Sequence, residues 1–268
     1  MEHDIQHNRQ GPLIETLGVT KVFNSGKQII TAISDISIKI FAGDFLIIFG
    51  SSTSGKTTLL SVLSGMEKPD LGEVLIKNEP FYELSEDERS FIRNKKFGFI
   101  PQSKRWVSHL NLLENVALPL IISGEKAAVA KKAALEILGQ YGLQDLSQHN
   151  PTTLSNVEQQ IASIARAVIN QPWLILVDEP YVSLTAEAVD KILGLLKKIN
   201  EETGCTILMS TNNASLLKHS NKWLFMDEGK LEDISSEKNS IKRLKEVIEI
   251  VEKQEQELKN KNVFDLSF

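Results

Sequence analysis

The chain has 268 residues, of which 41% are hydrophobic, and this is enough for one large domain or two small ones with a proper core. Its formal net charge of −5 argues against a general nucleic-acid-binding protein, which would normally be basic. Because Cys205 is the single cysteine, an intramolecular disulfide is excluded and a reducing cytoplasm fits. The strand-like segment around Cys205 predicts a packed core thiol.

No apolar run approaches the roughly 20 residues that a membrane-spanning helix needs. The most apolar segment, residues 116–122, is short and contains a proline. The polar N-terminus also lacks the apolar core of a signal peptide. We therefore expect a chain that is soluble by itself and that reaches a membrane only through a partner.

The first part of the chain is predicted to consist of a polar tail, residues 1–11, followed by short strands that are bounded by turn residues. In chain order, these strands span residues 13–23, 32–40, 45–49 and 73–77. Ser85 and Glu88 then have the spacing of a capping box, in which Ser85 caps a helix and Glu88 reaches back to it.

The second part alternates helices and strands. Residues 111–142 are predicted to be largely helical, with a break near Ser123. Residues 173–177 form a continuous apolar run, which suits a parallel strand buried on both faces. A helix over residues 185–199 then leads into the strand that holds Cys205. This alternation predicts an α/β fold with a parallel, doubly wound core.

The composition changes after Gly229, since residues 236–261 are dense in Glu and Lys. Apolar residues recur there at helical spacing, at Ile241, Leu244, Ile248, Val251 and Leu258. Glu255 interrupts this narrow stripe. Two interpretations stay open: a docking or coiled-coil seam, and a solvated amphipathic helix folded against its own domain.

The most informative motif follows the predicted strand 45–49 and opens a helix. It consists of Gly50, Ser51, Ser52, Thr53, Ser54, Gly55, Lys56, Thr57 and Thr58, and it fits the phosphate-loop pattern G-x-x-x-x-G-K-[ST]. Small residues let successive backbone N–H groups curl around phosphate oxygens, and the helix adds the positive end of its dipole. Lys56 is placed to reach the terminal phosphates, and the Thr57 hydroxyl to bind Mg²⁺. The motif therefore predicts MgATP as the ligand.

Two carboxylates complete this chemistry. Asp178 ends the buried apolar strand and suits Mg²⁺, held together with the Thr57 hydroxyl and phosphate oxygens. Glu179 follows directly and is placed to polarise an attacking water, as a catalytic base would. An acidic turn without function is the alternative, and the phosphate loop disfavours it.

With these motifs, residues 12–233 resemble the ATP-binding subunit of ATP-binding cassette (ABC) transporters. The segment after the phosphate loop, residues 60–74, is similar to the family's, and so is the stretch that ends at Gln102. Residues 114–120 are similar to the lipoprotein-releasing and macrolide-exporter branch, and to the cell-division ATPase branch.

The resemblance implies a P-loop NTPase fold with a RecA-like parallel-sheet core, an N-terminal antiparallel β subdomain and a helical subdomain over about residues 103–170. Residues 234–268 would then be a charged helical extension. The resemblance to the family also implies that Gln102 touches Mg²⁺ and the membrane-subunit interface. Phe23 stands where the family has an aromatic residue that stacks on adenine, which needs only a ring face.

The chain departs from the family at its signature, where Leu-Ser-Gly-Gly-Gln is replaced by residues 154–158, Leu-Ser-Asn-Val-Glu. In the family this segment clamps the γ-phosphate of the partner subunit's ATP, and glycines permit close backbone approach. We expect Val157 to put a branched side chain where the phosphate should lie, while the Ser155 hydroxyl remains for nucleotide contact.

Three further positions differ. Thr185 stands where the family has an aspartate in the D-loop, and Asn212 where it has a switch histidine. Asparagine can donate a hydrogen bond to a γ-phosphate, but it cannot become positively charged. Thr53 replaces a phosphate-loop glycine and would perturb the loop if its φ had to be positive.

We therefore expect ATP binding to be better preserved than hydrolysis. In the head-to-tail dimer of this family, each ATP lies between the phosphate loop of one subunit and the signature of the other. A homodimer would therefore have the altered signature and the missing switch histidine in both sites, so we predict a heterodimer with a second ATP-binding subunit. An integral membrane permease, at the cytoplasmic face of the cell membrane, is the expected partner, with export or lipoprotein extraction favoured.

Other interpretations are an ordinary ATPase that tolerates the substitutions, a regulatory subunit without turnover of its own, and a cell-division ATPase that signals across the membrane. A DNA-repair or translation ABC protein is disfavoured. The chain has neither a coiled-coil insertion between the motifs nor a second cassette, and we expect no nucleic-acid partner.

Overall fold

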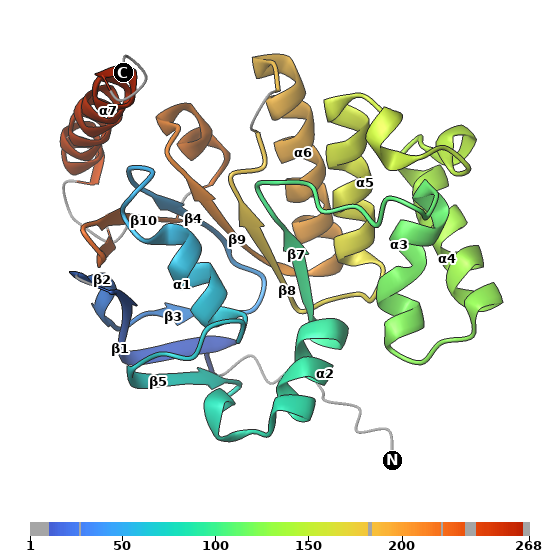
Figure 1. Cartoon of the computed structure of the whole chain (residues 1–268), viewed down its shortest axis with the longest axis horizontal. Coiled ribbons are helices and arrows are strands. Elements are labelled where there is room, and N and C mark those ends of the chain that lie inside the picture. The colour runs from blue at the N-terminus through green and yellow to red at the C-terminus, as the bar shows by residue number, and fades with distance from the viewer. Residues whose placement is uncertain (1–10, 27, 182–183, 221, 234–239, 265–268) are drawn as a thin grey trace.

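The computed structural model describes residues 11–264 apart from residues 27, 182–183, 221 and 234–239. Two β-sheets and their covering helices make up the described chain (Figure 1). The predicted N-terminal tail lies almost wholly outside the described residues. Within them, no helix combines the length and the apolar character that crossing a bilayer requires.

The larger sheet has six strands in the order β11-β10-β4-β9-β8-β7. Its strands are β4 (Phe45–Phe49), β7 (Phe97–Ile100), β8 (Leu174–Asp178), β9 (Thr206–Thr211), β10 (Lys222–Asp227) and β11 (Lys230–Asp233). All neighbours pair in parallel except β10 and β11. The predicted parallel core is therefore present, with one antiparallel strand at its edge.

The N-terminal sheet is antiparallel, in the order β2-β1-β5-β6 with β3 paired to β1. Its strands are β1 (Ile14–Ser25), β2 (Gln28–Ile36), β3 (Lys39–Ile40), β5 (Leu71–Ile76) and β6 (Glu79–Pro80). The strand predicted over residues 32–40 is thus two strands, because β2 ends at Ile36 and β3 begins at Lys39.

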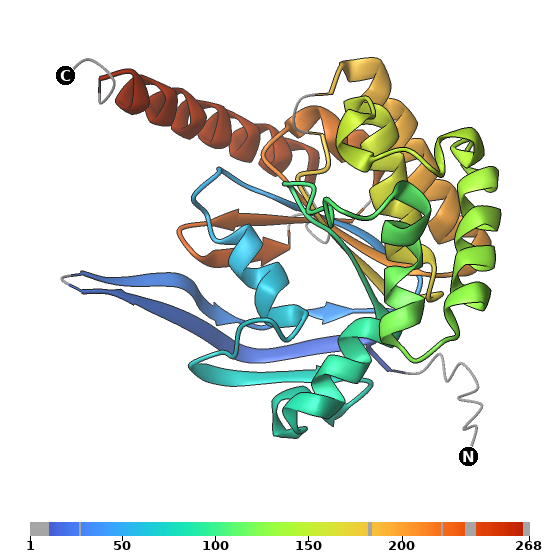
Figure 2. The ribbon, with the colours of Figure 1, turned by 45° about the vertical axis from the view of Figure 1, so that its right-hand side comes forward.

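Helix α1 (Lys56–Leu63) lies between the two sheets (Figure 2). Its buried leucines, Leu59, Leu60 and Leu63, share one hydrophobic cluster with Ile14 of β1 and Leu208 of β9. Burial on both sides of α1 joins the N-terminal sheet to the parallel sheet.

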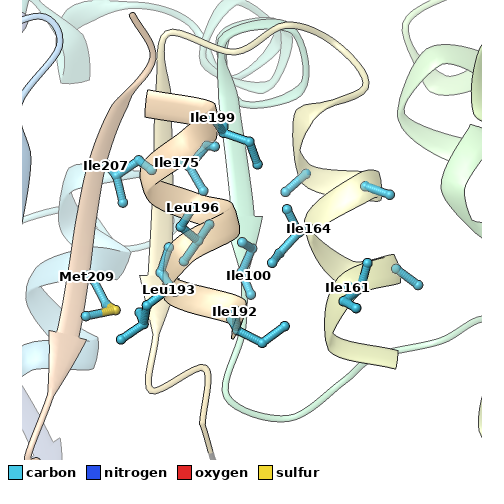
Figure 3. Packing of buried hydrophobic residues seen from close by; sticks show 14 of the residues in the cluster. Ile100, Ile161, Ile164, Ile175, Ile192, Leu193, Leu196, Ile199, Ile207 and Met209 are labelled. Carbon is cyan, nitrogen blue, oxygen red and sulfur yellow. The ribbon is translucent and has the colours of Figure 1, made fainter. Parts of the chain in front are cut away.

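The opposite face of the parallel sheet is covered by helices. They are α5 (Asn156–Val168) and α6 (Ala186–Thr203); beside them, α3 (Leu112–Ile122) packs against α5 and α4 (Ala127–Gln140) packs against α3, while α2 (Glu86–Lys96) precedes β7. Figure 3 shows isoleucine and leucine side chains of α5 and α6 packed against residues of β7, β8 and β9. Short 3₁₀ turns complete the chain: Phe81–Glu83, Gln144–Leu146, Pro151–Thr153 and Ala214–His219.

The continuous apolar sequence of strand β8 is explained by burial on both of its faces. Ile175 and Val177 belong to the cluster beneath α5 and α6, whereas Leu174 and Leu176 belong to the cluster around α1. Successive side chains of a strand point to opposite faces, and here both faces are covered. The predicted burial on both faces is confirmed.

Other local predictions are also confirmed. Ser85 caps α2 by accepting a hydrogen bond from the Glu88 N–H, and the Glu88 carboxylate accepts one from the Ser85 backbone N–H. The break near Ser123 separates α3 from α4. Cys205 is buried just before β9, and burial raises the pKa of its thiol to about 12.

The charged C-terminal segment forms the long helix α7 (Ser240–Phe264). Val247 and Val251 are buried in the large cluster, and Leu244 and Ile248 pack against it. Of the two interpretations, the helix folded against its own domain is therefore the one that the structure shows. The side chains of Ile241 and Leu258 lie outside the described part.

The close approach of α5 to β7 generates a stability prediction. A Cβ atom on Gly98 would lie 2.4 Å from the Ala167 carbonyl oxygen, so backbone atoms would have to move. We expect Gly98→Ala to lower the free energy of unfolding by about 1–3 kcal/mol in urea denaturation.

Gly194 of α6 is the matched control, because a Cβ there meets nothing within 4 Å. Gly194→Ala should raise the free energy of unfolding by up to about 1 kcal/mol, through helix propensity alone. Equal effects of the two substitutions would contradict the packing argument.

Candidate nucleotide site

The carboxyl ends of four parallel strands carry the candidate site. Gly50 follows β4, Asp178 ends β8, Gln102 lies two residues beyond β7, and Asn212 follows β9. Since β4, β9, β8 and β7 are adjacent and parallel, these ends meet at one edge of the sheet. Ligands of open α/β sheets bind at this edge.

The loop between β4 and α1 is held tightly by backbone on both sides. Gly55 has a φ of 101°, and a Cβ there would lie 2.2 Å from the Ala32 carbonyl oxygen of β2. A Cβ on Gly50 would lie 2.1 Å from the Met226 carbonyl oxygen of β10. Both glycines are therefore required by the fold. Thr53, by contrast, is not among the described residues with positive φ, so this substitution does not strain the loop.

Lys56 is almost fully buried, with 3% of its surface exposed. Its ammonium group donates hydrogen bonds to the carbonyl oxygens of Gly50, at 3.0 Å, and Ser51, at 2.5 Å. Burial lowers the pKa of Lys56, while the charges of Glu179, Asp178 and Glu255 oppose that shift. Lys56 is thus a cation held in position by the loop itself.

Thr57 and Asp178 form a compact oxygen cluster with Ser210. The Thr57 hydroxyl lies 3.0 Å from Asp178 Oδ2, and the Ser210 hydroxyl donates to Asp178 Oδ1 at 2.6 Å. Carboxylate and hydroxyl oxygens suit Mg²⁺. The described residues contain no group of three or more acidic, His or Cys side chains able to hold a metal by themselves. This set fits an ion whose remaining ligands are phosphate oxygens and water.

Glu179 lies beside this cluster, 4.0 Å from the Lys56 ammonium group. Gln102 donates a hydrogen bond from Nε2 to Glu179 Oε2 at 2.9 Å. Burial raises the pKa of Glu179, and the nearby charges of Asp178 and Glu255 add to this, while Lys56 opposes it. A carboxylate with a raised pKa is suited to accept a proton near neutral pH.

Tyr181 is a site residue that the sequence analysis missed. Its hydroxyl donates to Asn212 Oδ1 at 2.8 Å and accepts from the Asn212 N–H at 3.1 Å and from the Thr211 hydroxyl at 2.8 Å. The Asn212 amide is thereby oriented so that Nδ2 donates to Ser52 Oγ at 3.1 Å. An aromatic residue directly after Asp178-Glu179-Pro180 was the available signal.

The segment predicted to stand in place of the family signature opens helix α5. Ser155 accepts a hydrogen bond from the Glu158 N–H, and the Glu158 carboxylate accepts one from the Ser155 N–H. Val157 is half-buried and packs against the large hydrophobic cluster, and its expected encounter with a partner's phosphate stays a prediction. The Asn156 side chain accepts a hydrogen bond from Lys104 at 3.3 Å.

Two other predicted residues have clear structural surroundings. Thr185 caps α6 by accepting a hydrogen bond from the Ala188 N–H at 3.3 Å. Phe23 lies on β1 opposite Ile30, is 38% exposed, and has the Lys21 ammonium group 5.4 Å from its ring centre. The adenine contact of Phe23 and the phosphate contact of Ser155 stay predictions.

Comparison with known proteins agrees with this geometry. A sequence profile described as ABC transporter matches residues 33–182. The lipoprotein-releasing system ATP-binding protein LolD of Wigglesworthia glossinidia brevipalpis is 37% identical over 219 residues, which are 82% of this chain and 96% of that relative. The macrolide export ATP-binding/permease protein MacB of Wolinella succinogenes is 35% identical, over 87% of this chain and 37% of its own length.

Solved structures are similar as well. The dimeric ABC transporter cassette MJ0796 superposes with a TM-score of 0.76 at 36% identity, over 82% of this chain and 98% of that chain. The same cassette in a dimeric post-hydrolysis state, bound to ADP and Pi, gives a TM-score of 0.76 at 35% identity. The curated sequence of MJ0796, from Methanocaldococcus jannaschii, is 37% identical over 227 residues.

The raised pKa of Glu179 generates a pH-dependent stability prediction. A carboxyl whose pKa is higher in the folded state stabilises the fold below its unfolded pKa, about 4.3, and this contribution is lost as the pH rises through the folded pKa. The glutamine of Glu179→Gln carries no charge at any pH, so its contribution to stability does not fall as the pH rises. The variant should therefore melt at a higher temperature than the parent at pH 7.5, with a gain that shrinks towards pH 4.

Glu73→Gln, at an exposed position of β5, is the matched control and should leave the melting temperature unchanged across this range. A lower melting temperature for Glu179→Gln at pH 7.5 would mean that attraction to Lys56 outweighs burial, contrary to the prediction.

Proposed function

This chain belongs to the ABC transporter family, and on that premise we propose that it is the ATP-binding subunit of a membrane ABC complex, in which MgATP drives a conformational change of an integral membrane permease. The observation that carries the proposal is the meeting of Lys56, Thr57, Asp178 and Glu179 at one edge of the parallel sheet. A cation, oxygen ligands for a hard metal and a carboxylate of raised pKa are the groups that phosphoryl chemistry uses.

The roles that we propose follow from this geometry. The loop N–H groups and Lys56 bind the β- and γ-phosphates, with the dipole of α1 adding to the attraction. Thr57 and Asp178 would hold Mg²⁺, with Gln102 beside it, and the ion would neutralise charge on the terminal phosphates. Glu179, oriented by Gln102, accepts a proton from the attacking water. Phe23 offers its ring to the adenine.

We further propose that this chain's own site hydrolyses ATP poorly. Asn212 presents an amide N–H₂ towards the phosphate loop and supplies a hydrogen bond without a charge. At the signature, Asn156 and Val157 put Cβ atoms where the family has glycines, so the backbone cannot approach a partner's phosphate as closely. A heterodimer, with a second ATP-binding subunit that contributes an intact signature, would restore one of the two sites.

The relatives favour export or lipoprotein extraction over uptake as the work of the complex. One is named for lipoprotein release, and the name of another joins macrolide export with a permease function. We accordingly assign the chain to the cytoplasmic face of the cell membrane as a peripheral subunit of such a permease.

A second candidate function is a regulatory ATP-binding subunit with no turnover of its own. This function is favoured by the hydrogen-bond network of Tyr181, Asn212 and Ser52. The network connects the uncharged Asn212 to the phosphate loop, where Asn212 would sense bound phosphate rather than take part in catalysis. Turnover that stays at the background level in every variant below would select this candidate.

Because the signature and switch positions differ from the family pattern, we predict that restoring the family residues there increases ATP turnover. We expect the purified chain to bind MgATP and to release phosphate little faster than its Glu179→Gln variant. A triple variant with Asn156→Gly, Val157→Gly and Asn212→His should release phosphate about ten- to a hundredfold faster, because each change restores an interaction with the transition state. Melting curves control for the glycines in α5, which cost about 1 kcal/mol each. Full turnover by the parent chain, lost in Glu179→Gln, would contradict poor hydrolysis.

The heterodimer predicts a specific oligomeric state. The Glu179→Gln variant with MgATP should remain monomeric in native mass spectrometry, whereas the same variant with the signature and Asn212 restored should form a homodimer. A nucleotide-dependent homodimer of the unrestored chain would overturn the heterodimer proposal.

A further inference from the structure

Helix α7 is held in one position by contacts that do not involve the nucleotide site. Val247 and Val251 are 0% and 1% exposed in the large hydrophobic cluster. Arg243 donates to both carboxylate oxygens of Glu232 on β11, each at 2.7 Å. Figures 1 and 2 both show α7 alongside the loop between β4 and α1. The helix is therefore docked by packing and by an ion pair at its beginning.

The docked face of α7 leads directly to the phosphate loop. Residues four apart lie on one face of a helix, so the face that buries Val247 and Val251 continues to Glu255. Next to it, Gln254 donates to Asp227 Oδ1 of β10 at 3.0 Å. The position of Glu255 thus follows from the docking of the preceding turns. It is the residue that interrupts the apolar stripe of this helix.

Glu255 binds the phosphate loop through one carboxylate oxygen. Its Oε1 accepts hydrogen bonds from the Ser52 backbone N–H at 2.6 Å and from the Ser52 hydroxyl at 2.7 Å. Burial raises the pKa of Glu255, but the hydrogen bonds from Ser52 and Asn212 and the charge of Lys56 outweigh this, and the net pKa lies below its usual range. The carboxylate is therefore held as an anion.

The groups around this anion are the ones that we assign to the phosphates of ATP. A loop N–H, the Ser52 hydroxyl, the Asn212 amide and the Lys56 ammonium group all act on Glu255. An N–H group that donates to a carboxylate cannot donate to a phosphate at full strength as well, and two anions in one concave site repel each other.

We propose that Glu255 of α7 is an intramolecular competitor of the ATP phosphates, so that MgATP binds only when the Glu255 end of α7 leaves the phosphate loop. This inference rests on the proposed ATP site and adds its regulation. Because only the fraction of molecules with α7 released binds MgATP, the apparent affinity is lowered by that fraction. By linkage, MgATP in turn favours release of the helix.

The test compares MgATP dissociation constants, measured by isothermal titration calorimetry, for the full-length chain and its variants. Glu255→Gln and Glu255→Ala should bind MgATP about three- to tenfold more tightly, as expected for loss of a partly exposed, charge-assisted contact. Glu257→Gln is the matched control, since Glu257 carries the same charge at an exposed position of the same helix, and it should bind as the parent does.

A second measurement reports on the helix itself. Hydrogen exchange of the amides of residues 247–257 should become faster when MgATP is added to the parent chain, and the same amides should already exchange faster in Glu255→Ala. If Glu255 had only a structural role, adding MgATP would leave the hydrogen-exchange rates of these α7 amides unchanged.

The outcomes separate this inference from the proposed function. Binding that is lost in Lys56→Ala but equal in the parent, Glu255→Gln and Glu257→Gln would overturn the competitor role and leave the ATP site standing. Weaker binding in Glu255→Gln, or slower exchange of α7 with MgATP, would overturn it too. No MgATP binding by the parent or by either Glu255 variant would instead refute the ATP site.

Discussion

The structure of this site depends on one buried positive charge. Lys56 is nearly inaccessible to water, and three carboxylates, those of Glu179, Asp178 and Glu255, act on it. Burial alone would favour a neutral amine, and it is the surrounding anions that keep the charge favourable. The same ammonium group lowers the cost of burying Glu179. Cation and carboxylates therefore form one electrostatic unit, and Glu255 is the member that we propose the phosphates of ATP displace.

A chain of hydrogen bonds connects this unit to the periphery of the molecule. Tyr181 orients Asn212, Asn212 donates to Ser52, and Ser52 donates to Glu255 of α7. The residues come from the ends of β8 and β9, from the phosphate loop and from the C-terminal helix. Asn212, which we predict to stand at the switch-histidine position of the family, is thus part of a larger network. Asn212 and Tyr181 form a matched pair that couples the end of β9 to the loop, and through the loop to α7.

The packed core of the domain explains how the residues of this network are held at fixed positions. The parallel strands β4, β9 and β8 are buried on both faces, and α1 is packed between the two sheets. Close packing of this kind resists compression, so the strand ends that carry the site are held at fixed positions. The contacts that the described residues of α7 make beside this edge are polar, from Ser52 to Glu255 and from Gln254 to Asp227.

The sequence by itself determined the features that depend on neighbours along the chain. The phosphate loop, the capping box of Ser85 and the doubly buried strand β8 all follow from spacing, because the interacting groups lie within a few residues of one another. It also indicated that Glu255 breaks an apolar stripe. Only the tertiary structure decided what that break is for, since Ser52 and Glu255 are 203 positions apart. Tyr181, the core-facing packing of Val157 and the docking of α7 were decided in the same way. Each depends on how elements distant in sequence are packed together, and hydrophobic burial, which drives that packing, is not directional enough to be inferred from residue spacing.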